Sequence, residues 1–193
     1  MSADLLTTTA IIWALFGVYW VLCAVRNRKS FTPPAESESS FYRPFRILLL
    51  AFAFLLLFWK RTAIGVLGSR FVPQTSAIAI AGFVIMLAGL GIGLWARRHL
   101  GEYWSDKVML QASHKLIRSG PYAYMRHPIY SGVLLGMAGT ALILGEWRGV
   151  LSFLLMSINY TIKAKREEHI LRTQFGAEFE EHKNHAGFLL PRL

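Results

Sequence analysis

A polar stretch of 17 residues contains the first group of side chains that could do chemistry. It runs HKLIRSGPYAYMRHPIY over positions 114–130 and ends in Arg126, His127 and Pro128. Pro128 biases His127 toward extended backbone and is well suited to the first position of a helix. The first N–H groups of that helix have no partner inside it, so together with Arg126 they could bind a carboxylate or a phosphate. The alternative is that arginine and tyrosine only anchor a helix at a membrane surface.

A second charged stretch, KAKREE, occupies positions 163–168. Lys163 and Glu167 are four residues apart, so on a helix they can pair on one face. Two adjacent carboxylates, Glu167 and Glu168, could also bind a cation such as an amino group. The alternative is a solvated face of salt bridges, which would contribute little.

Several common chemistries lack their sequence patterns. The chain has no glycine-rich nucleotide loop, no H-E-x-x-H and no G-x-S-x-G. Cys23 is the single cysteine, so neither a disulfide within the chain nor a multi-cysteine metal site can form. The nearest approach to a metal pattern is His182-x-x-His185, and we expect no metal site.

The composition places these stretches in a membrane protein. Hydrophobic residues make up 54% and charged residues 17% of the chain, whereas soluble domains have about 25% charged residues. Mean hydropathy is +0.39 and the net charge is +10. Because the basic residues flank apolar runs, they are better explained by orientation in a bilayer and by anionic headgroups than by nucleic acid. We therefore expect membrane lipids, and no nucleic acid, as partners.

Five apolar runs predict an all-α integral membrane protein with about five transmembrane helices. They cover residues 5–25, 47–59, 75–96, 129–145 and 149–162. The first and third are uncharged over lengths that can span about 30 Å of hydrocarbon. The second has 13 residues and needs flanking basic and aromatic side chains to reach the interfaces. We expect one domain, 1–193, with two spans in 1–74 and the remaining spans and the cofactor-binding segments in 75–193.

The last two spans are predicted to form a tight antiparallel hairpin. Residues 146–148 between them are too few for anything but a turn, and Pro128 opens the first of the two helices. No proline interrupts residues 149–176, so the final helix should continue out of the membrane through residues 163–171. Glycines four residues apart, at 89 and 93 and at 132 and 136, predict a close contact between the third and fourth spans.

The distribution of basic residues predicts the orientation. Five Lys and Arg residues lie in 26–46, six in 97–126 and six after residue 162, whereas only four lie in the remaining segments. Five spans place all three basic segments on one side, which the positive-inside rule assigns to the cytoplasm. The N-terminus is then outside, and both polar stretches face the cytoplasm.

The two polar stretches together resemble a known family. The pattern is H-x-L-I-x-S-G-P-Y-x-x-x-R-H-P-x-Y-x-G, followed by a helical hairpin and then R-E-E-x-x-L-x-x-x-F-G. It is similar to the isoprenylcysteine carboxyl methyltransferase family, and the related membrane phospholipid methyltransferases share much of it. The resemblance covers roughly position 107 to the C-terminus, nearly half of the chain. The spacing of the two blocks is much more specific than either block alone.

This resemblance implies S-adenosylmethionine as methyl donor, bound without a Rossmann domain. It implies cofactor contacts from two groups of residues, Lys107, His114, Lys115, Leu116, Ile117, Tyr122, His127, Pro128, Ile129 and Tyr130 in the first and Glu167 with its neighbour Glu168 in the second. The candidate catalytic residues are Lys163 and Arg126. Lys163 falls where the family places a basic residue near the substrate carboxylate. Lysine keeps the charge of the arginine in eukaryotic members but loses its bidentate geometry.

Transfer from a sulfonium needs no metal and, for a carboxylate acceptor, no general base, so positioning and exclusion of water should dominate. A soluble cofactor could enter from the cytoplasm and a lipophilic small-molecule or prenylated acceptor from the bilayer. The acceptor group, a carboxylate, an amine or a thiol, stays open. The alternatives are a phospholipid N-methyltransferase, an NADPH-dependent membrane reductase of the sterol reductase type, and a non-catalytic transporter or lipid-binding scaffold.

Overall fold

The structure is a computed structural model, and it describes residues 2–27, 42–101 and 116–192. Within these ranges the elements are helical and no strand is formed, as predicted. In chain order the helices are α1 (Ser2–Asn27), α2 (Tyr42–Phe58), η2 (Lys60–Thr62), η3 (Gly65–Gly68), α3 (Ser76–Leu100), η5 (Gly120–Ala123), α4 (Pro128–Leu144), α5 (Trp147–Phe175) and α6 (Ala177–His185).

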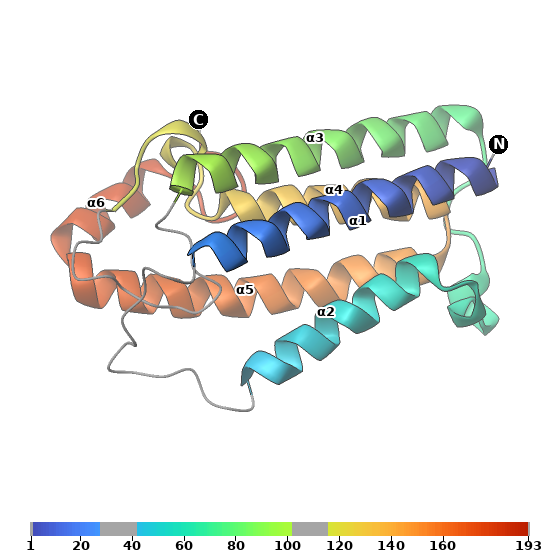
Figure 1. The fold of residues 1–193 in the computed structure, drawn as a ribbon, viewed down its shortest axis with the longest axis horizontal. Helices are drawn as coiled ribbons and strands as arrows, with labels where there is room; N and C mark the ends of the chain where they lie inside the picture. The colour runs from blue at the N-terminus through green and yellow to red at the C-terminus, as the bar shows by residue number, and fades with distance from the viewer. Residues whose placement is uncertain (1, 28–41, 102–115, 193) are drawn as a thin grey trace.

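Four long helices, α1, α3, α4 and α5, run along the long axis of the molecule, and α2 crosses obliquely beside α5 (Figure 1). The short α6 lies at one end, where α5 extends beyond the other helices. The turn between α4 and α5 lies at the opposite end. One end of the bundle is therefore formed by the charged part of α5 together with α6, and the opposite end by the turn between α4 and α5.

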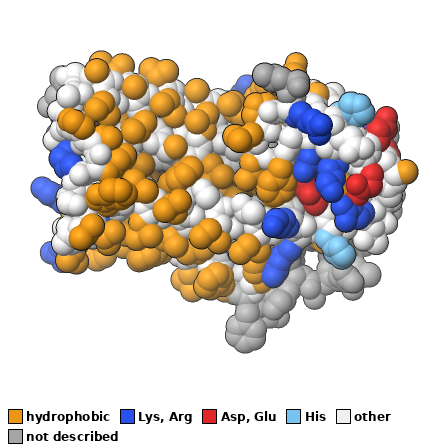
Figure 2. Space-filling view, turned by 180° about the vertical axis from the view of Figure 1, so that it is seen from behind, with side chains coloured by type: hydrophobic (Ala, Val, Ile, Leu, Met, Phe, Trp, Pro, Cys, Tyr) orange, Lys and Arg blue, Asp and Glu red, His pale blue; other side chains and the backbone are white. Residues whose placement is uncertain are grey.

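Among the described residues, two helices are long and apolar enough to cross a membrane, Asp4–Arg26 and Ser76–Leu100. Only 11% and 28% of the residues in their most apolar windows are buried, so they are not the central helices of a soluble core. Large apolar side chains such as Leu15, Leu48 and Val84 are instead exposed on the outside of the bundle. On the face seen in Figure 2, hydrophobic side chains cover much of the length of the bundle, and most of the charged side chains lie toward one end, with a few basic ones at the other. These features indicate a membrane protein, and the predicted number of five spans stays a prediction.

The predicted glycine contact between α3 and α4 is confirmed. A Cβ atom on Gly89 would lie 2.5 Å from the carbonyl oxygen of Gly132, and a Cβ on Gly132 would lie 2.6 Å from that of Gly89. Gly82 and Gly139 face each other in the same way, closer to the start of α3 and to the end of α4. The two helices thus touch backbone to backbone, which larger residues would prevent.

The hairpin of α4 and α5 turns at Gly145, whose φ of 67° is left-handed and whose N–H bonds to Ala141. Arg148, only 4% exposed, fixes the turn to α2. It donates to Glu146 at 2.6 Å and, from Nη1, to the carbonyl oxygen of Leu56 at 2.9 Å. The predicted hairpin and the continuation of the last helix past the apolar run are both confirmed.

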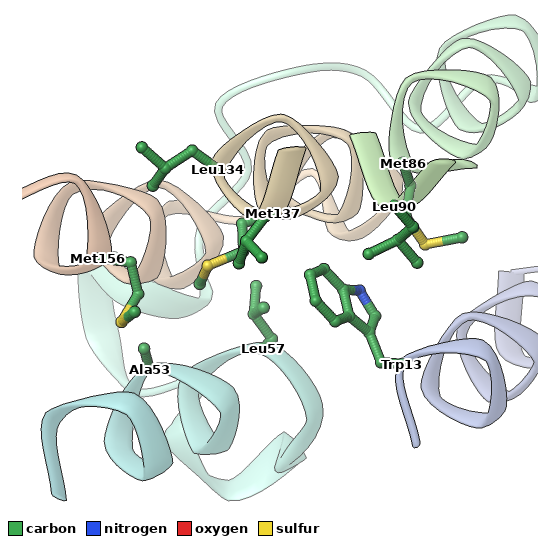
Figure 3. Packing of buried hydrophobic residues seen from close by; sticks show 9 residues of the cluster. Trp13, Ala53, Leu57, Met86, Leu90, Leu134, Met137 and Met156 are labelled. Carbon is green, nitrogen blue, oxygen red and sulfur yellow. The ribbon is translucent and has the colours of Figure 1, made fainter. Parts of the chain in front are cut away.

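A buried cluster at the centre joins α1, α2, α3, α4 and α5 (Figure 3). Trp13 of α1 reaches into it, and its indole N–H donates to the hydroxyl of Thr140 at 3.0 Å. Met86, Met137 and Met156 are fully buried in the same cluster. This packing fixes α4 and α5 relative to each other, and their ends carry the polar stretches.

Candidate functional site

The beginning of α4 and the polar half of α5 meet at the α6 end of the bundle. η5 makes the turn predicted at Gly120, whose φ is 58°, and Pro128 occupies the first turn of α4. Because α5 is uninterrupted over 29 residues, it carries its charged stretch beyond the apolar part of the bundle. The two sequence-predicted blocks are thereby brought into direct contact.

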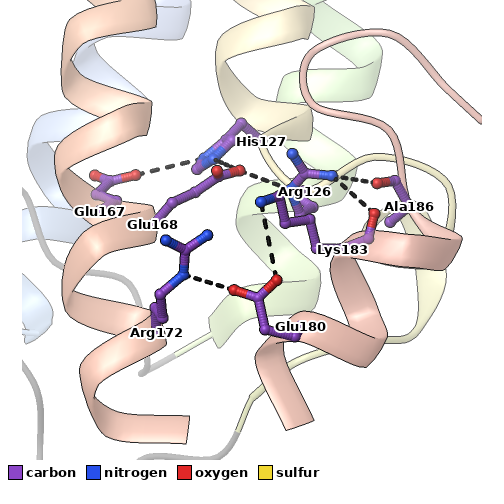
Figure 4. A network of polar contacts seen from close by, with 8 residues as sticks. All are labelled: Arg126, His127, Glu167, Glu168, Arg172, Glu180, Lys183 and Ala186. Atoms are coloured by element: carbon purple, nitrogen blue, oxygen red, sulfur yellow. Dashed lines mark hydrogen bonds and ion pairs between the residues drawn. The ribbon is translucent and has the colours of Figure 1, made fainter. Parts of the chain in front are cut away.

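His127 lies between the two carboxylates of α5 (Figure 4). Its Nδ1 is 3.6 Å from Glu167 Oε2, and its Nε2 is 3.3 Å from Glu168 Oε1. The histidine side chain is only 5% exposed. An imidazole with both nitrogens facing carboxylates is best matched in its doubly protonated form, in which both are donors.

Glu167 has two further partners. The hydroxyl of Tyr130 donates to its Oε1 at 2.5 Å, and Lys163 Nζ lies 3.7 Å from the same oxygen, one turn earlier on α5. The ammonium group of Lys163 also lies 5.4 Å from the centre of the Tyr130 ring. Tyr130 in turn stacks on Tyr160 with ring centres 4.8 Å apart. The predicted pairing of Lys163 with Glu167 is confirmed, and it includes a tyrosine from α4.

Arg126 connects Glu168 to the C-terminal segment. Its Nε donates to Glu168 Oε1 at 2.6 Å, and its Nη1 donates to the carbonyl oxygens of Ala186 and, at 3.4 Å, Lys183 (Figure 4). The guanidinium group of Arg126 therefore makes its contacts within the protein. Its predicted catalytic role stays a prediction, whereas its contacts give it a structural one.

The electrostatics of the cluster follow from these contacts. Burial would lower the pKa of His127, but hydrogen bonds to and the charges of Glu167 and Glu168 outweigh it and raise that pKa. Burial would raise the pKa of Glu167, but the charge of Lys163 and the contacts with His127 and Tyr130 lower it. Burial opposes ionisation of Glu168 too, and His127 and Arg126 lower its pKa. Near pH 7 both carboxylates are ionised.

An apolar wall adjoins the cluster. Tyr122 and Ile129 are buried with Ala96 of α3, and Ile117 packs against them. Burial raises the pKa of Tyr122, and the charge of Glu167 raises it further. His99 at the end of α3 stacks on Tyr122. One side of the site is therefore ionic and the other aromatic and aliphatic.

The remaining predicted residues fall into two classes. Pro128 is fully buried at the start of α4, and Leu116 is half-buried at the beginning of the last described range. Lys107, His114 and Lys115 lie outside the described residues. The predicted cofactor-binding role of the whole set stays a prediction.

The C-terminal segment is a part of the site that sequence reasoning missed. The N–H of Arg126 donates to the carbonyl oxygen of Gly187 at 2.8 Å, and the N–H of Gly187 donates to the carbonyl oxygen of Tyr124 at 3.0 Å. The Phe188 ring meets the His127 ring edge-on with centres 5.3 Å apart. The signal that could have found it is the return of apolar residues at 188–191 after the polar α6, and that signal names no partner.

Comparison with known proteins places the site in a family. The family model described as "Phospholipid methyltransferase" matches residues 77–178, which include nearly all of α3, the whole of α4 and the charged stretch of α5. The match covers more than half of the chain and contains Arg126, His127, Lys163, Glu167 and Glu168.

Individual relatives match over shorter stretches. A "Probable protein-S-isoprenylcysteine O-methyltransferase" of Oryza sativa subsp. japonica is 33% identical over 115 residues, which are 57% of this chain and 60% of the rice protein. The "Protein-S-isoprenylcysteine O-methyltransferase" of Schizosaccharomyces pombe is 30% identical over 99 residues, 44% of this chain and 42% of the yeast protein. An "Uncharacterized protein YpbQ" of Bacillus subtilis is 33% identical over 63 residues, 33% of this chain and 36% of that protein.

These matches span less than two thirds of the length of each relative. They agree with the family predicted from the two polar blocks, and that prediction is confirmed. The chain belongs to the phospholipid methyltransferase family and is related to the protein-S-isoprenylcysteine O-methyltransferases.

Proposed function

We propose that the protein is a membrane methyltransferase that uses S-adenosylmethionine to methylate a lipophilic acceptor, most like the carboxylate of an isoprenylated cysteine. The observation that carries the proposal is the cluster of His127, Tyr130 and Glu167 next to the buried apolar wall. An ionised carboxylate beside an aromatic and aliphatic surface suits a ligand that has both an ammonium group and a purine. The family supports the reaction class.

The residues fit the donor in two respects. Glu167 is ionised because Lys163, His127 and Tyr130 lower its pKa, so it can pair with the ammonium of a methionine moiety. Tyr122, Ile117 and Ile129 offer the apolar surface that an adenine ring needs. When bound, S-adenosylmethionine supplies an electrophilic methyl group on a sulfonium, and an acceptor oxygen takes that methyl as the carbon–sulfur bond breaks.

The chain's own residues then bind and position rather than exchange protons. His127 holds Glu167 and Glu168 in fixed orientations, because each of its two ring nitrogens faces one carboxylate. Lys163 is 8% exposed at the point where α5 leaves its apolar part, so it can attract an acceptor carboxylate from the membrane side. Fixing donor and acceptor in line, away from water, accounts for the acceleration that this class of transfer needs.

We also propose that this end of the bundle faces the cytoplasm and that the N-terminus is outside. The distribution of Lys and Arg supports this orientation. A soluble donor would then reach the site from the cytoplasm, and a lipophilic acceptor would reach it through the bilayer. The description of the family model favours a phospholipid amine as the second candidate acceptor.

Donor binding is the first test. The purified protein should bind labelled S-adenosylmethionine, and Glu167→Gln should weaken that binding at least tenfold, because a charge-assisted pair contributes about 1.5–3 kcal/mol. Glu180→Gln is the matched control, since Glu180 of α6 pairs with Arg172 of α5 and is 45% exposed. Equal binding by wild type and the Glu167 variant would refute the assignment. Stabilisation by NADPH with none by S-adenosylmethionine would favour a reductase.

A further inference from the structure

The C-terminal segment that follows α6 is anchored beside the beginning of α4 on both sides of Phe188. Before this residue, the N–H of Arg126 donates to the carbonyl oxygen of Gly187 at 2.8 Å. After it, the hydroxyl of Ser131 donates to the carbonyl oxygen of Leu189 at 2.5 Å. The Leu189 side chain also packs against the central apolar cluster. The backbone on either side of Phe188 is therefore fixed to α4 and to the residues just before it.

The ring of Phe188 contacts two side chains that bind the carboxylates of α5. It meets the imidazole of His127 edge-on, with ring centres 5.3 Å apart and planes at 76°. The guanidinium carbon of Arg126 lies 5.6 Å from the centre of the same Phe188 ring. Both separations are within the range of aromatic and cation–π attraction. One residue of the C-terminal segment thus touches both Arg126 and His127, which both contact Glu168.

The neighbours of His127 decide how its ring is turned. The last side-chain torsion of histidine is broad and roughly two-fold, so the backbone alone does not choose between two orientations related by a half-turn. In the observed orientation, Nδ1 faces Glu167 and Nε2 faces Glu168. A half-turn would bring ring carbons to both carboxylates and remove both contacts. The two carboxylates favour the observed orientation, and packing against the ring must oppose rotation out of it.

Two aromatic rings supply this packing. Tyr130 of α4 stacks on the imidazole of His127, with planes at 10° and ring centres 5.5 Å apart. Phe188 adds a nearly perpendicular contact from a different segment, and the histidine side chain is only 5% exposed. Phe188 itself is half-buried. Removing its ring would admit water, which would compete for the ring N–H donors of His127 and let the imidazole turn.

We propose that Phe188 is a positioning residue of the donor site, which holds the His127 ring in the orientation where each nitrogen faces one carboxylate. The C-terminal segment thereby sets how firmly Glu167 is presented to the ammonium group of the donor. This inference rests on the function proposed above, in which Glu167 binds S-adenosylmethionine. Phe188 lies outside residues 77–178, which the family model matches, so the family match gives it no role.

The first test measures donor affinity with the full chain, purified in detergent. We expect Phe188→Ala to weaken the binding of labelled S-adenosylmethionine about three- to tenfold, because the aromatic contact that holds His127 is lost. Phe188→Tyr keeps the ring and should bind within about twofold of the wild type. Leu190→Ala is the matched control and should leave the affinity unchanged, because Leu190 is on the same segment and is 79% exposed.

The second test needs no donor. Nuclear magnetic resonance of protein with isotope-labelled histidine records the ring N–H groups of the doubly protonated imidazole at about pH 6. His127→Gln identifies the signals of His127 by their loss. We expect two ring N–H signals from His127 in the wild type, Phe188→Tyr and Leu190→Ala, because protons held on carboxylates exchange slowly with water. In Phe188→Ala both signals should be lost to exchange.

Persistence of both His127 signals in Phe188→Ala would overturn the positioning role, and so would donor binding by Phe188→Ala at the wild-type affinity. An equal loss of affinity in Phe188→Ala and Phe188→Tyr would do the same, since the ring would then not be the cause. If the wild type binds no donor, the function proposed above fails, while the donor-free spectra still decide whether Phe188 holds His127.

Discussion

Substituting Gly89 by alanine tests whether α3 and α4 are packed as closely as the structure places them. A Cβ atom on Gly89 would lie 2.5 Å from the carbonyl oxygen of Gly132, about 0.9 Å short of ordinary van der Waals contact at 3.4 Å. The obstacle is the backbone of α4, which cannot rotate away as a side chain could. The helices must therefore separate, and overpacking of this kind costs about 1–3 kcal/mol.

Gly91→Ala is the matched control, because a Cβ atom at Gly91 would have no atom within 4 Å. Both variants gain the same helix propensity, so the difference between them isolates the packing term. We expect the thermal midpoint in detergent, followed by circular dichroism, to be about 2–12 °C lower for Gly89→Ala than for Gly91→Ala, given roughly 2–4 °C per kcal/mol for chains of this size. Equal midpoints would refute the close approach of the two helices.

Three further variants test other contacts. The pKa of His127 is raised in the folded protein, so its ion pairs stabilise the fold fully below about pH 6.5. This stabilisation is lost as the pH rises through the higher pKa of the folded state. The thermal midpoint of His127→Gln should therefore fall less steeply above that pH than the thermal midpoint of the wild type. An unchanged pH profile would contradict the cluster. Trp13→Phe removes a buried hydrogen bond to Thr140 and should lower stability by about 1 kcal/mol, read as a midpoint shift of a few degrees; no shift would show that the bond is not made. Arg148→Met leaves Glu146 without its partner at 2.6 Å and should cost about 3 kcal/mol in the same assay; a neutral result would mean that Arg148 does not hold α2 in place.

Local signals in the sequence predicted the helices well. The uncharged run at 75–96 became α3, Pro128 opened α4, and the absence of proline after Gly149 correctly predicted one long α5. The four-residue glycine spacing correctly predicted the contact of α3 with α4. Each of these rules depends on neighbours a few residues apart, so a single sequence suffices to apply them.

Apart from the glycine contact of α3 with α4, contacts between distant segments were not predicted. Arg148 reaches α2 from a position 92 residues later, and Trp13 reaches α4 across 127 residues. The return of the C-terminal segment to Arg126 has the same character. Such pairs have no periodicity, and their partners are decided by how the whole bundle packs.

The candidate site was predicted in part from the sequence. Spacing alone predicted that Lys163 and Glu167 share a helix face, and the distance of 3.7 Å confirms it. That the stretch with His127 and the stretch with Glu167 and Glu168 belong to one site was implied by the family pattern. The position of His127 between the two carboxylates was not predicted, because His127 and Glu168 are 41 residues apart in the sequence. Tyr160, which stacks on Tyr130, carried no signal beyond being an aromatic residue in an apolar run.

The central claim is methyl transfer at the cluster around Glu167, and following the methyl group tests it most directly. Membranes containing the wild-type chain should transfer the labelled methyl of S-adenosylmethionine to a prenylated cysteine substrate as a base-labile ester, and Glu167→Gln should abolish this while Glu180→Gln retains it. Label in phospholipid amines instead would change the acceptor but keep the site. Transfer by Glu167→Gln at the wild-type rate, or no transfer by wild type to either acceptor, would contradict the account.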